Sequence, residues 1–285
     1  MTRLERFDFT TGTALVTGAA GGIGEQLALG LAARGSDLVL LDRDAPRLEE
    51  VAASIRDRDP EVGVETHVID LADRPALLEL AARVAADHPD LNLLVNNAGV
   101  ALGGNFEHTT LEEFDWVMDI NFRAPVALVH CLLPTLVANP GSHVVNMSSL
   151  FGIIAPAGQS AYSSSKFALR GFSEVLRTEL AEHSVGVTVV HPGGIRTQIA
   201  TSARIAAGAP ADEVEAGIAE VHRLLRYPPE RAAAEILSGV HRRRSRVLVT
   251  PEAVVGDLAA RLAPVRHAGL LDAVTRAMTR VTGPR

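Results

Sequence analysis

Tyr162 and Lys166 are the residues whose types and spacing most clearly suggest chemistry. The chain has only two tyrosines, and Tyr162 stands four residues before Lys166 in the stretch SAYSSSK. Residues four apart on a helix share a face, so the phenol and the ammonium group would point into one cleft. A cation about 4 Å away supplies roughly the 4 kcal/mol needed to lower a tyrosine pKa by about three units. The pair would therefore form a general acid/base that works near neutral pH.

Ser149 adds a third polar group to this pair. It lies in MSSLFG, at the end of an apolar run and thirteen residues before Tyr162. Ser148 is its neighbour, but successive residues of a strand face opposite sides, so only one of the two should reach the cleft. Residues 160–183 predict the helix that carries Tyr162 and Lys166, because their apolar residues form one stripe. The stripe consists of Leu169, Phe172, Leu176 and Leu180.

Seven short apolar or β-branched runs alternate with helical segments along the chain. Such alternation predicts parallel βαβ units with right-handed crossovers, and the continuous apolar runs indicate helices on both sheet faces. The sequence therefore predicts an α/β fold: one doubly wound Rossmann-type sheet of about seven parallel strands. The runs are TALVT at 13, DLVLLD at 37, VETHVID at 64, LNLLVN at 91, SHVVNM at 142, VGVTVV at 185 and RVLVT at 246.

A glycine cluster, TGAAGGIG at residues 17–24, follows the first run and opens the first helical segment. Glycines let the backbone approach a pyrophosphate, which the helix amides then hold. Asp42 ends the second run, 18 residues beyond Gly24, where a carboxylate would bind the adenosine ribose. It would also repel a 2′-phosphate, which favours NAD over NADP. Arg43 follows directly and leaves the alternative open, because it could pair with that phosphate.

These motifs together resemble the short-chain dehydrogenase/reductase family. The glycines follow the family pattern TGxxxGxG, NNAG stands at 96–99, and Ser149, Tyr162 and Lys166 match the catalytic signature, with Asn121 of MDINF at a fourth family position. The resemblance runs from about residue 12 to 197. It implies that Ser149 binds the substrate oxygen, Tyr162 exchanges the proton and Lys166 lowers the Tyr162 pKa and holds the nicotinamide ribose. Asn121 would shape a helix and a water-mediated proton relay.

The resemblance also implies a set of cofactor contacts. Asp70 would contact the adenine amino group, although a helix N-cap is the competing interpretation. HPGGIRT, at 191–197, resembles the family's PG motif; His191 replaces an Asn often found there and is expected to be structural rather than catalytic. The implied contacts are Gly18, Gly22, Ile23, Gly24, Asp42, Asp70, Leu71, Asn96, Ala98, Gly99, Tyr162, Lys166, Pro192, Ile195 and Thr197.

Composition narrows the function classes. The formal net charge of −7 lacks the basic excess that nucleic-acid binding needs, so we expect no nucleic acid. The family resemblance implies instead a small-molecule alcohol or carbonyl substrate. The one cysteine, Cys131, excludes an internal disulfide and a cysteine-rich metal cage, and no metal is expected. No signal-peptide core and no run of about 18 apolar residues is visible, which predicts a cytoplasmic protein.

Residues 1–285 are predicted to form a single domain with two additions. One is a substrate loop or lid at about 198–227, and the other is a helical extension at about 252–285. That extension could cover the pocket, contact another subunit or lie on an anionic membrane surface. From the resemblance we expect a homodimer or homotetramer. Mainly apolar residues would line the pocket, namely Leu102, Phe106, Leu150, Phe151, Ile153, Ile154, Ile199 and Leu224 or Tyr227.

The pattern therefore predicts an NAD(P)-dependent alcohol dehydrogenase or carbonyl reductase that acts on a lipophilic secondary alcohol or ketone. Two alternatives remain open. One is a related enzyme that uses bound cofactor for epimerisation or dehydration, and the other is a non-catalytic dinucleotide-binding protein.

Overall fold

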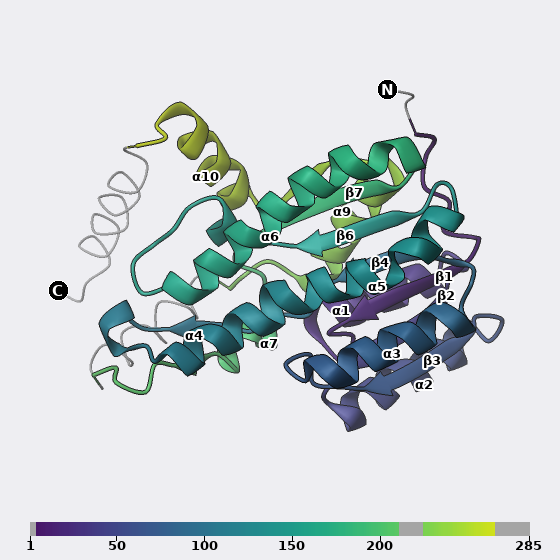
Figure 1. Cartoon of the computed structure of the whole chain (residues 1–285), viewed down its shortest axis with the longest axis horizontal. Coiled ribbons are helices and arrows are strands. Elements are labelled where there is room, and N and C mark those ends of the chain that lie inside the picture. Colours follow the sequence, from purple (N-terminus) through teal and green to yellow (C-terminus); the bar gives the residue numbers. More distant parts are fainter. Residues whose placement is uncertain (1–3, 211–224, 266–285) are drawn as a thin grey trace.

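A seven-stranded parallel sheet organises the protein (Figure 1). The computed structural model describes residues 4–210 and 225–265. Every pairing in the sheet is parallel, and the strand order is β3-β2-β1-β4-β6-β7-β9. The strands are β1 (Thr13–Thr17), β2 (Asp37–Asp42), β3 (Val64–Val68), β4 (Leu91–Asn96), β6 (His143–Met147), β7 (Gly186–Pro192) and β9 (Arg246–Val249).

Helices cover both faces of this sheet, as the continuous apolar strands require. On one face α1, α2 and α9 bury a core that includes Leu27, Leu48 and Ile236. On the other face α3, α5 and α6 bury a second core, and Figure 1 shows these three helices across the front of the sheet. Their bounds are α1 (Gly22–Ala32), α2 (Ala45–Arg58), α3 (Arg74–Asp87), α5 (Ala124–Ala138), α6 (Ser160–Glu179) and α9 (Pro229–His241).

The strand order places a topological switch between β1 and β4. The chain runs outward from β1 through β2 to β3 and then returns to β4 on the other side of β1. Ligands bind at such a point, beyond the carboxyl ends of the strands, in doubly wound sheets. The predicted Rossmann-type fold is confirmed, and so is the helix from residue 160, which ends at Glu179 and continues as a 3₁₀ turn, η4 (Leu180–His183).

A second, two-stranded sheet was not predicted. It joins β5 (Leu102–Gly103) to β8 (Arg204–Ile205) in parallel. A short helix, α7 (Gln198–Thr201), precedes β8, and α4 (Leu111–Met118) packs against α6. The guanidinium of Arg204 lies 3.8 Å from the ring centroid of Trp116 on α4. The beginning of the predicted lid is therefore fastened to α4 and β5, whereas residues 211–224 lie outside the described residues.

The basic run HRRRSR at 241–246 has a structural use. The Arg243 guanidinium donates to the carbonyl oxygen of Ser142 at 2.9 Å and lies 5.0 Å from the ring centroid of Phe7. The Phe7 backbone is itself paired with His241 in both directions, through N–H to carbonyl and carbonyl to Nδ1, each at 2.9 Å. The run thus anchors the N-terminal segment at the edge where the strands begin.

α10 (Pro251–Leu262) packs against the turn that follows β6. A Cβ at Gly256 would lie 2.5 Å from a side-chain carbon of Leu150, so the two elements are in close contact. The remainder of the predicted C-terminal extension, residues 266–285, lies outside the described residues. Several large apolar side chains near α10 are exposed: Val254, Val255, Leu258, Leu262 and Val265.

One helical stretch of the described residues, Leu111–Ala138, is long and apolar enough to cross a membrane by length and composition. It comprises α4, a π-helical turn η2 (Asp119–Arg123) and α5. Half of its most apolar window is buried inside the protein, and Leu132 and Leu136 are completely buried in the core between α3 and α6. Core packing therefore accounts for its apolar character.

Candidate active site

The glycine-rich loop between β1 and α1 has contacts that exclude side chains. Gly18 has a φ of 67°, and a Cβ there would lie 2.8 Å from the Cα of Ala98. A Cβ at Gly24 would lie 1.9 Å from the carbonyl oxygen of Gly18, so only glycine lets the loop close over the helix. α1 begins after Gly21, and no side chain caps its first amides. These uncapped amides and the positive end of the helix fit the pyrophosphate of a dinucleotide.

Asp42 stands at the carboxyl end of β2, beside this loop. One carboxylate oxygen accepts from the backbone N–H of Ala20 at 2.9 Å, and the other accepts from the N–H of Asp44 at 3.0 Å. The carboxylate is thereby held at the edge of the glycine loop. This is the position that an adenosine ribose occupies in a dinucleotide-binding fold.

The two arginines near Asp42, Arg47 and Arg43, differ in whether glutamate side chains already neutralise their charge. Arg47 is paired with Glu25 at 3.2 Å and also with Glu50, so its charge is neutralised by α1 and α2. Arg43 is exposed at the start of the loop after β2. A 2′-phosphate would meet the Asp42 carboxylate together with one exposed arginine.

Thr17 connects the glycine loop to β4. Its hydroxyl accepts from the backbone N–H groups of Asn97 and Ala98, each at 3.0 Å. The Asn97 side chain in turn donates to the carbonyl oxygens of Thr17 at 2.9 Å and Gly18 at 3.1 Å. The asparagines of NNAG follow an apolar strand, where buried amides must be hydrogen-bonded, and Asn97 meets that expectation. The role of Thr17 was not predicted, although a hydroxyl at the end of an apolar strand was the signal that could have identified it.

Asn96 is buried between strands. Its side-chain amide donates to Oδ1 of Asn146 on β6 at 2.8 Å, and the Asn146 amide donates to the hydroxyl of Ser173 at 2.9 Å. Asn96 thus hydrogen-bonds the neighbouring strand, as a buried amide side chain requires. Its own Oδ1 is buried without a hydrogen-bond partner among the described residues, and its predicted cofactor contact stays a prediction.

Ser149 and Tyr162 meet at the carboxyl end of β6. The side chain of Ser149 lies close enough to the phenol of Tyr162 to lower the pKa of that phenol, and its oxygen accepts from the backbone N–H of Phe151 at 3.1 Å. The ring of Phe151 stands edge-on to that of Tyr162, with centroids 6.2 Å apart. Ser148 instead donates to the carbonyl oxygen of Lys166 at 2.9 Å. Ser149, rather than Ser148, therefore reaches Tyr162.

Lys166 lies one turn beyond Tyr162 on α6. Its ammonium nitrogen is 5.6 Å from the centroid of the Tyr162 ring and donates to the carbonyl oxygen of Met147 at 2.9 Å. A Cβ at Gly99 would lie 3.2 Å from both the Lys166 nitrogen and Oδ1 of Asn121. The NNAG turn thus brings Gly99 against two of the predicted catalytic residues.

Asn121 occupies the π-helical turn between α4 and α5. Its side chain accepts from the N–H of Val100 at 2.8 Å and donates to the carbonyl oxygen of Val100 at 2.9 Å. It also donates to the hydroxyl of Ser165 on α6 at 3.1 Å. π-Helical turns occur mostly at functional sites, and here the irregular turn carries a side chain that joins the NNAG turn to the catalytic helix.

Burial is the main influence on the pKa values of Tyr162 and Lys166. Burial raises the pKa of Tyr162, and the hydrogen bond with Ser149 opposes that rise. Burial also lowers the pKa of Lys166 to about 8. The expectation that Lys166 lowers the Tyr162 pKa concerns the site with its cofactor bound, and it stays a prediction. The ammonium group donates to the carbonyl oxygen of Met147, and burial is the largest influence on the phenol.

The PG motif lies between the glycine loop and β9. Pro192 ends β7, and Ile195 is buried and forms a β-bridge with Tyr227. A Cβ at Gly22 would lie 3.0 Å from the methyl group of Thr197, so Thr197 stands directly over the start of α1. The sequence expectation that these residues lie beside a dinucleotide is consistent with this arrangement.

Asp70 is not the N-cap of α3. Its carboxylate accepts from the N–H of Ala72 at 2.9 Å in a local turn, and Asp73 caps the helix through the N–H of Ala76. The alternative interpretation of Asp70 is therefore wrong, and the adenine contact stays a prediction. Ile23 and Leu71 are partly buried against the two cores.

The apolar residues predicted to line a pocket separate into groups. Leu102, Ile153 and Ile154 are buried in the protein, Phe106 is exposed at the surface, and Leu224 lies outside the described residues. The Tyr227 hydroxyl donates to Glu235 on α9. Phe151 and Ile199 are partly buried close to the catalytic residues: Phe151 faces Tyr162, and Ile199 is 3.8 Å from a Cβ at Gly99.

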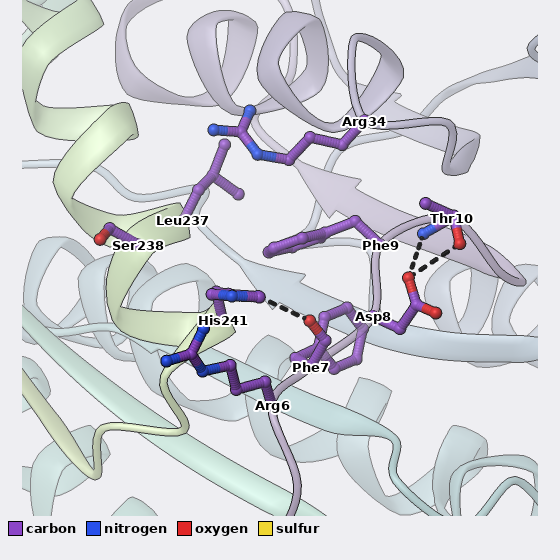
Figure 2. A pocket seen from close by; sticks show the side chains of 9 residues that line it. All are labelled: Arg6, Phe7, Asp8, Phe9, Thr10, Arg34, Leu237, Ser238 and His241. Atoms are coloured by element: carbon purple, nitrogen blue, oxygen red, sulfur yellow. Dashed lines mark hydrogen bonds between the residues drawn. The ribbon is translucent and has the colours of Figure 1, made fainter.

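A cavity of about 700 Å³ lies elsewhere, between the N-terminal segment, α1 and α9 (Figure 2). Figure 2 shows the ring of Phe9 between the side chains of Arg34 and His241. The residues that line this cavity flank the edge of the sheet where the strands begin. The glycine loop and Ser149 follow the opposite ends of β1 and β6, so the cavity is separate from the candidate active site. Among residues 4–210 and 225–265, no group of three or more His, Cys, Asp or Glu side chains could hold a metal ion.

Comparison with known proteins agrees with the site. The model of the short chain dehydrogenase family matches residues 12–207. SadH of Mycobacterium tuberculosis, which its name assigns provisionally to the oxidoreductases, is 39% identical over 253 residues, covering 87% of this chain and 90% of SadH.

Two solved structures show the same fold. A short-chain dehydrogenase from Sphingobium yanoikuyae in complex with NADPH is 30% identical, covers 96% of each chain and has a TM-score of 0.74. A short chain dehydrogenase/reductase from Burkholderia phymatum in complex with NAD has a TM-score of 0.82 at 24% identity, covering 90% of this chain and 94% of that one.

Proposed function

The chain belongs to the short chain dehydrogenase family of NAD(P)-dependent oxidoreductases, and we propose that it interconverts a lipophilic secondary alcohol and the corresponding ketone. One observation carries the proposal: Ser149, Tyr162, Lys166 and Asn121 converge beside a glycine loop whose shape fits a dinucleotide. The bound nicotinamide supplies hydride transfer to and from the substrate carbon.

The protein residues supply the proton and the geometry. Ser149 donates a hydrogen bond to the substrate oxygen, and Tyr162 gives a proton to that oxygen during reduction or removes it during oxidation. Because burial raises the Tyr162 pKa, the phenol is protonated at neutral pH in this geometry and is ready to act as the acid of carbonyl reduction. Lys166 and Asn121 orient the helix and the turn that face it.

The cofactor preference is proposed to be NAD. Asp42 is held at the ribose position by two backbone hydrogen bonds and would repel a 2′-phosphate, while Arg47 is already paired with glutamates. Relatives of this fold have been solved with NAD and with NADPH, so the fold accepts either cofactor, and the proposed preference for NAD rests on the Asp42 carboxylate. Replacing Asp42 by Ala should narrow the preference, measured as the ratio of kcat/KM with NADH and NADPH. An unchanged ratio would contradict the assignment.

The apolar character of the substrate is inferred from Phe151 and Ile199, which flank Tyr162 and Gly99. Arg196, Arg204 and Arg226 are exposed, and Arg204 is stacked on Trp116, so they do not form a clamp for a substrate carboxylate. A homodimer or homotetramer and a cytoplasmic location remain part of the proposal.

The experiment is a panel of alkyl and aryl secondary alcohols and ketones with each dinucleotide, followed by nicotinamide absorbance. We expect turnover that rises with substrate apolarity and is lost in Tyr162→Phe. Binding of NADH without a net absorbance change on any alcohol or ketone would favour epimerisation, dehydration or a binding-only role. Full turnover by Tyr162→Phe would refute the proton-transfer step.

A further inference from the structure

His191 lies at the carboxyl end of β7 and is completely buried. Its Nδ1 is 2.9 Å from the backbone carbonyl oxygen of Ser149. A carbonyl oxygen can only accept, so Nδ1 carries the hydrogen and donates it. The other nitrogen, Nε2, is buried and has no hydrogen-bond partner among the described residues. Nδ1 of His191 therefore contacts the backbone of Ser149, the residue whose hydroxyl takes part in the proposed reaction.

Ser149 needs such a contact because it stands outside the sheet. The last residue pair of β6 and β7 is Met147 with Val190, so Ser149 lies two residues beyond the ladder. Its backbone is fully extended, with φ −163° and ψ 167°, and then enters the 3₁₀ turn η3 (Leu150–Gly152). The carbonyl oxygen of Ser149 accepts from His191 and from the N–H of Gly152 at 3.0 Å. His191 supplies the hydrogen bond that ties this segment to the neighbouring strand.

We propose that His191 is a positioning residue for the reaction: its Nδ1–H fixes the Ser149 carbonyl and so aims the Ser149 hydroxyl at Tyr162 and the substrate oxygen. The inference rests on the proposed function, in which Ser149 binds that oxygen. His191 itself touches Ser149 only through the backbone, so it is not a catalytic residue.

Simple packing does not explain an imidazole at this place. An apolar side chain would fill the volume without burying Nε2 unpartnered, an arrangement that costs free energy because a desolvated nitrogen loses its hydrogen bond to water. Three charged groups act on the ring: Arg246 of β9, Arg170 of α6 and Asp257 of α10. Burial is the largest influence and lowers the His191 pKa to about 4, so the ring is neutral at neutral pH. The hydrogen bond that Nδ1 donates to Ser149 offsets the free-energy cost of burying Nε2 without a partner.

The first experiment compares His191→Leu with His191→Asn in the full-length protein. The Asn side-chain amide places a donor close to the position of Nδ1, whereas Leu removes it. We expect kcat to fall about 10- to 100-fold in His191→Leu, because small misplacements of a reacting group have effects of this size. KM and the dissociation constant of NADH should change by less than about threefold, and His191→Asn should recover most of kcat.

A second buried histidine, His143, provides the control for a general loss of stability. His143 is also buried and contacts the neighbouring strand through Thr188, but at the other end of β6. His143→Leu should lower stability without changing kcat per folded molecule. If His143→Leu loses as much kcat as His191→Leu, the loss in both variants reflects destabilisation, and the proposal is overturned. Equal kcat values for the Leu and Asn variants of His191 would also overturn it.

A second readout does not require turnover. The chain has two tyrosines, so in a Tyr227→Phe background the tyrosinate absorbance reports Tyr162 alone. The Ser149 hydrogen bond holds the Tyr162 pKa down, so His191→Leu should raise that pKa by about one unit and His191→Asn should not. An unmoved titration in His191→Leu contradicts the inference. A moved titration in a protein that turns over no substrate would support the positioning of Ser149 while refuting the proposed function.

Discussion

Two buried histidines should make the stability of this protein sensitive to mild acid. His143 and His191 are both inside the protein, and burial lowers their pKa values to about 3 and about 4. In the unfolded chain each would titrate near its ordinary value of 6.5. Between the folded and unfolded pKa values, the unfolded state binds protons that the native state refuses. Stability is therefore complete above pH 6.5 and falls as the pH decreases.

The size of the effect follows from the shifts. One pKa unit corresponds to about 1.4 kcal/mol, so the shift of His143 is worth about 5 kcal/mol and that of His191 about 3 kcal/mol. Between about pH 5.5 and 4.5 both contribute their full slope, about 2.7 kcal/mol per pH unit together. The geometry agrees for His143, because its Nδ1 faces the Arg243 guanidinium at 3.1 Å and cannot accept a proton there without loss of that contact.

The assay is chemical denaturation at a series of pH values, with the free energy of unfolding plotted against pH. In His143→Gln, the Gln amide can still donate to Thr188 but does not titrate, so the slope should fall by about 1.4 kcal/mol per pH unit. The exposed His130 provides the matched control His130→Gln, which removes a histidine from the surface. An identical slope for wild type and His143→Gln would refute the reasoning.

Further expectations concern the site. Gly24→Ala should weaken NADH binding at least tenfold and lower stability by about 1–3 kcal/mol, because its Cβ would collide with the Gly18 carbonyl; calorimetric titration and thermal unfolding test both. Ser149→Ala should lower kcat about 100-fold or more with little change in NADH affinity, as removal of one oxyanion-type donor does. Ser148→Ala should instead lower stability by about 1 kcal/mol through its lost bond to the Lys166 carbonyl, with kcat retained; reversed kinetics of the two serine variants would contradict the geometry.

Much of the fold followed from local patterns. The strand beginning at Thr13 and the helix beginning at Ser160 were predictable because continuous apolar runs and a helical stripe reflect their burial. The pair β5 and β8 was not predictable, because each strand has two residues and their pairing depends on contacts such as that of Arg204 with Trp116. The sequence carries no local periodicity for such an element.

The site was predictable in membership but less so in its electrostatics. Helical spacing placed Tyr162 and Lys166 on one face, and the resemblance to the short-chain dehydrogenase/reductase family added Ser149 and Asn121. The rise that burial causes in the Tyr162 pKa was not predictable from spacing, since burial depends on how the whole fold packs around the phenol. His191 was expected to be structural, and only three-dimensional contact shows that it donates to Ser149.

The pairing of Phe7 with His241 has a consequence for synthesis. The two residues are 234 positions apart in the sequence. The Phe7 backbone N–H donates to the carbonyl oxygen of His241, and the Phe7 carbonyl oxygen is hydrogen-bonded to Nδ1 of His241. A chain made at about 5–20 residues per second exposes Phe7 for roughly 10–50 seconds before its partner exists. Phe7 is thus made long before its segment can dock fully, and any nascent chain that stops before α9 lacks the two hydrogen bonds that His241 makes with the Phe7 backbone.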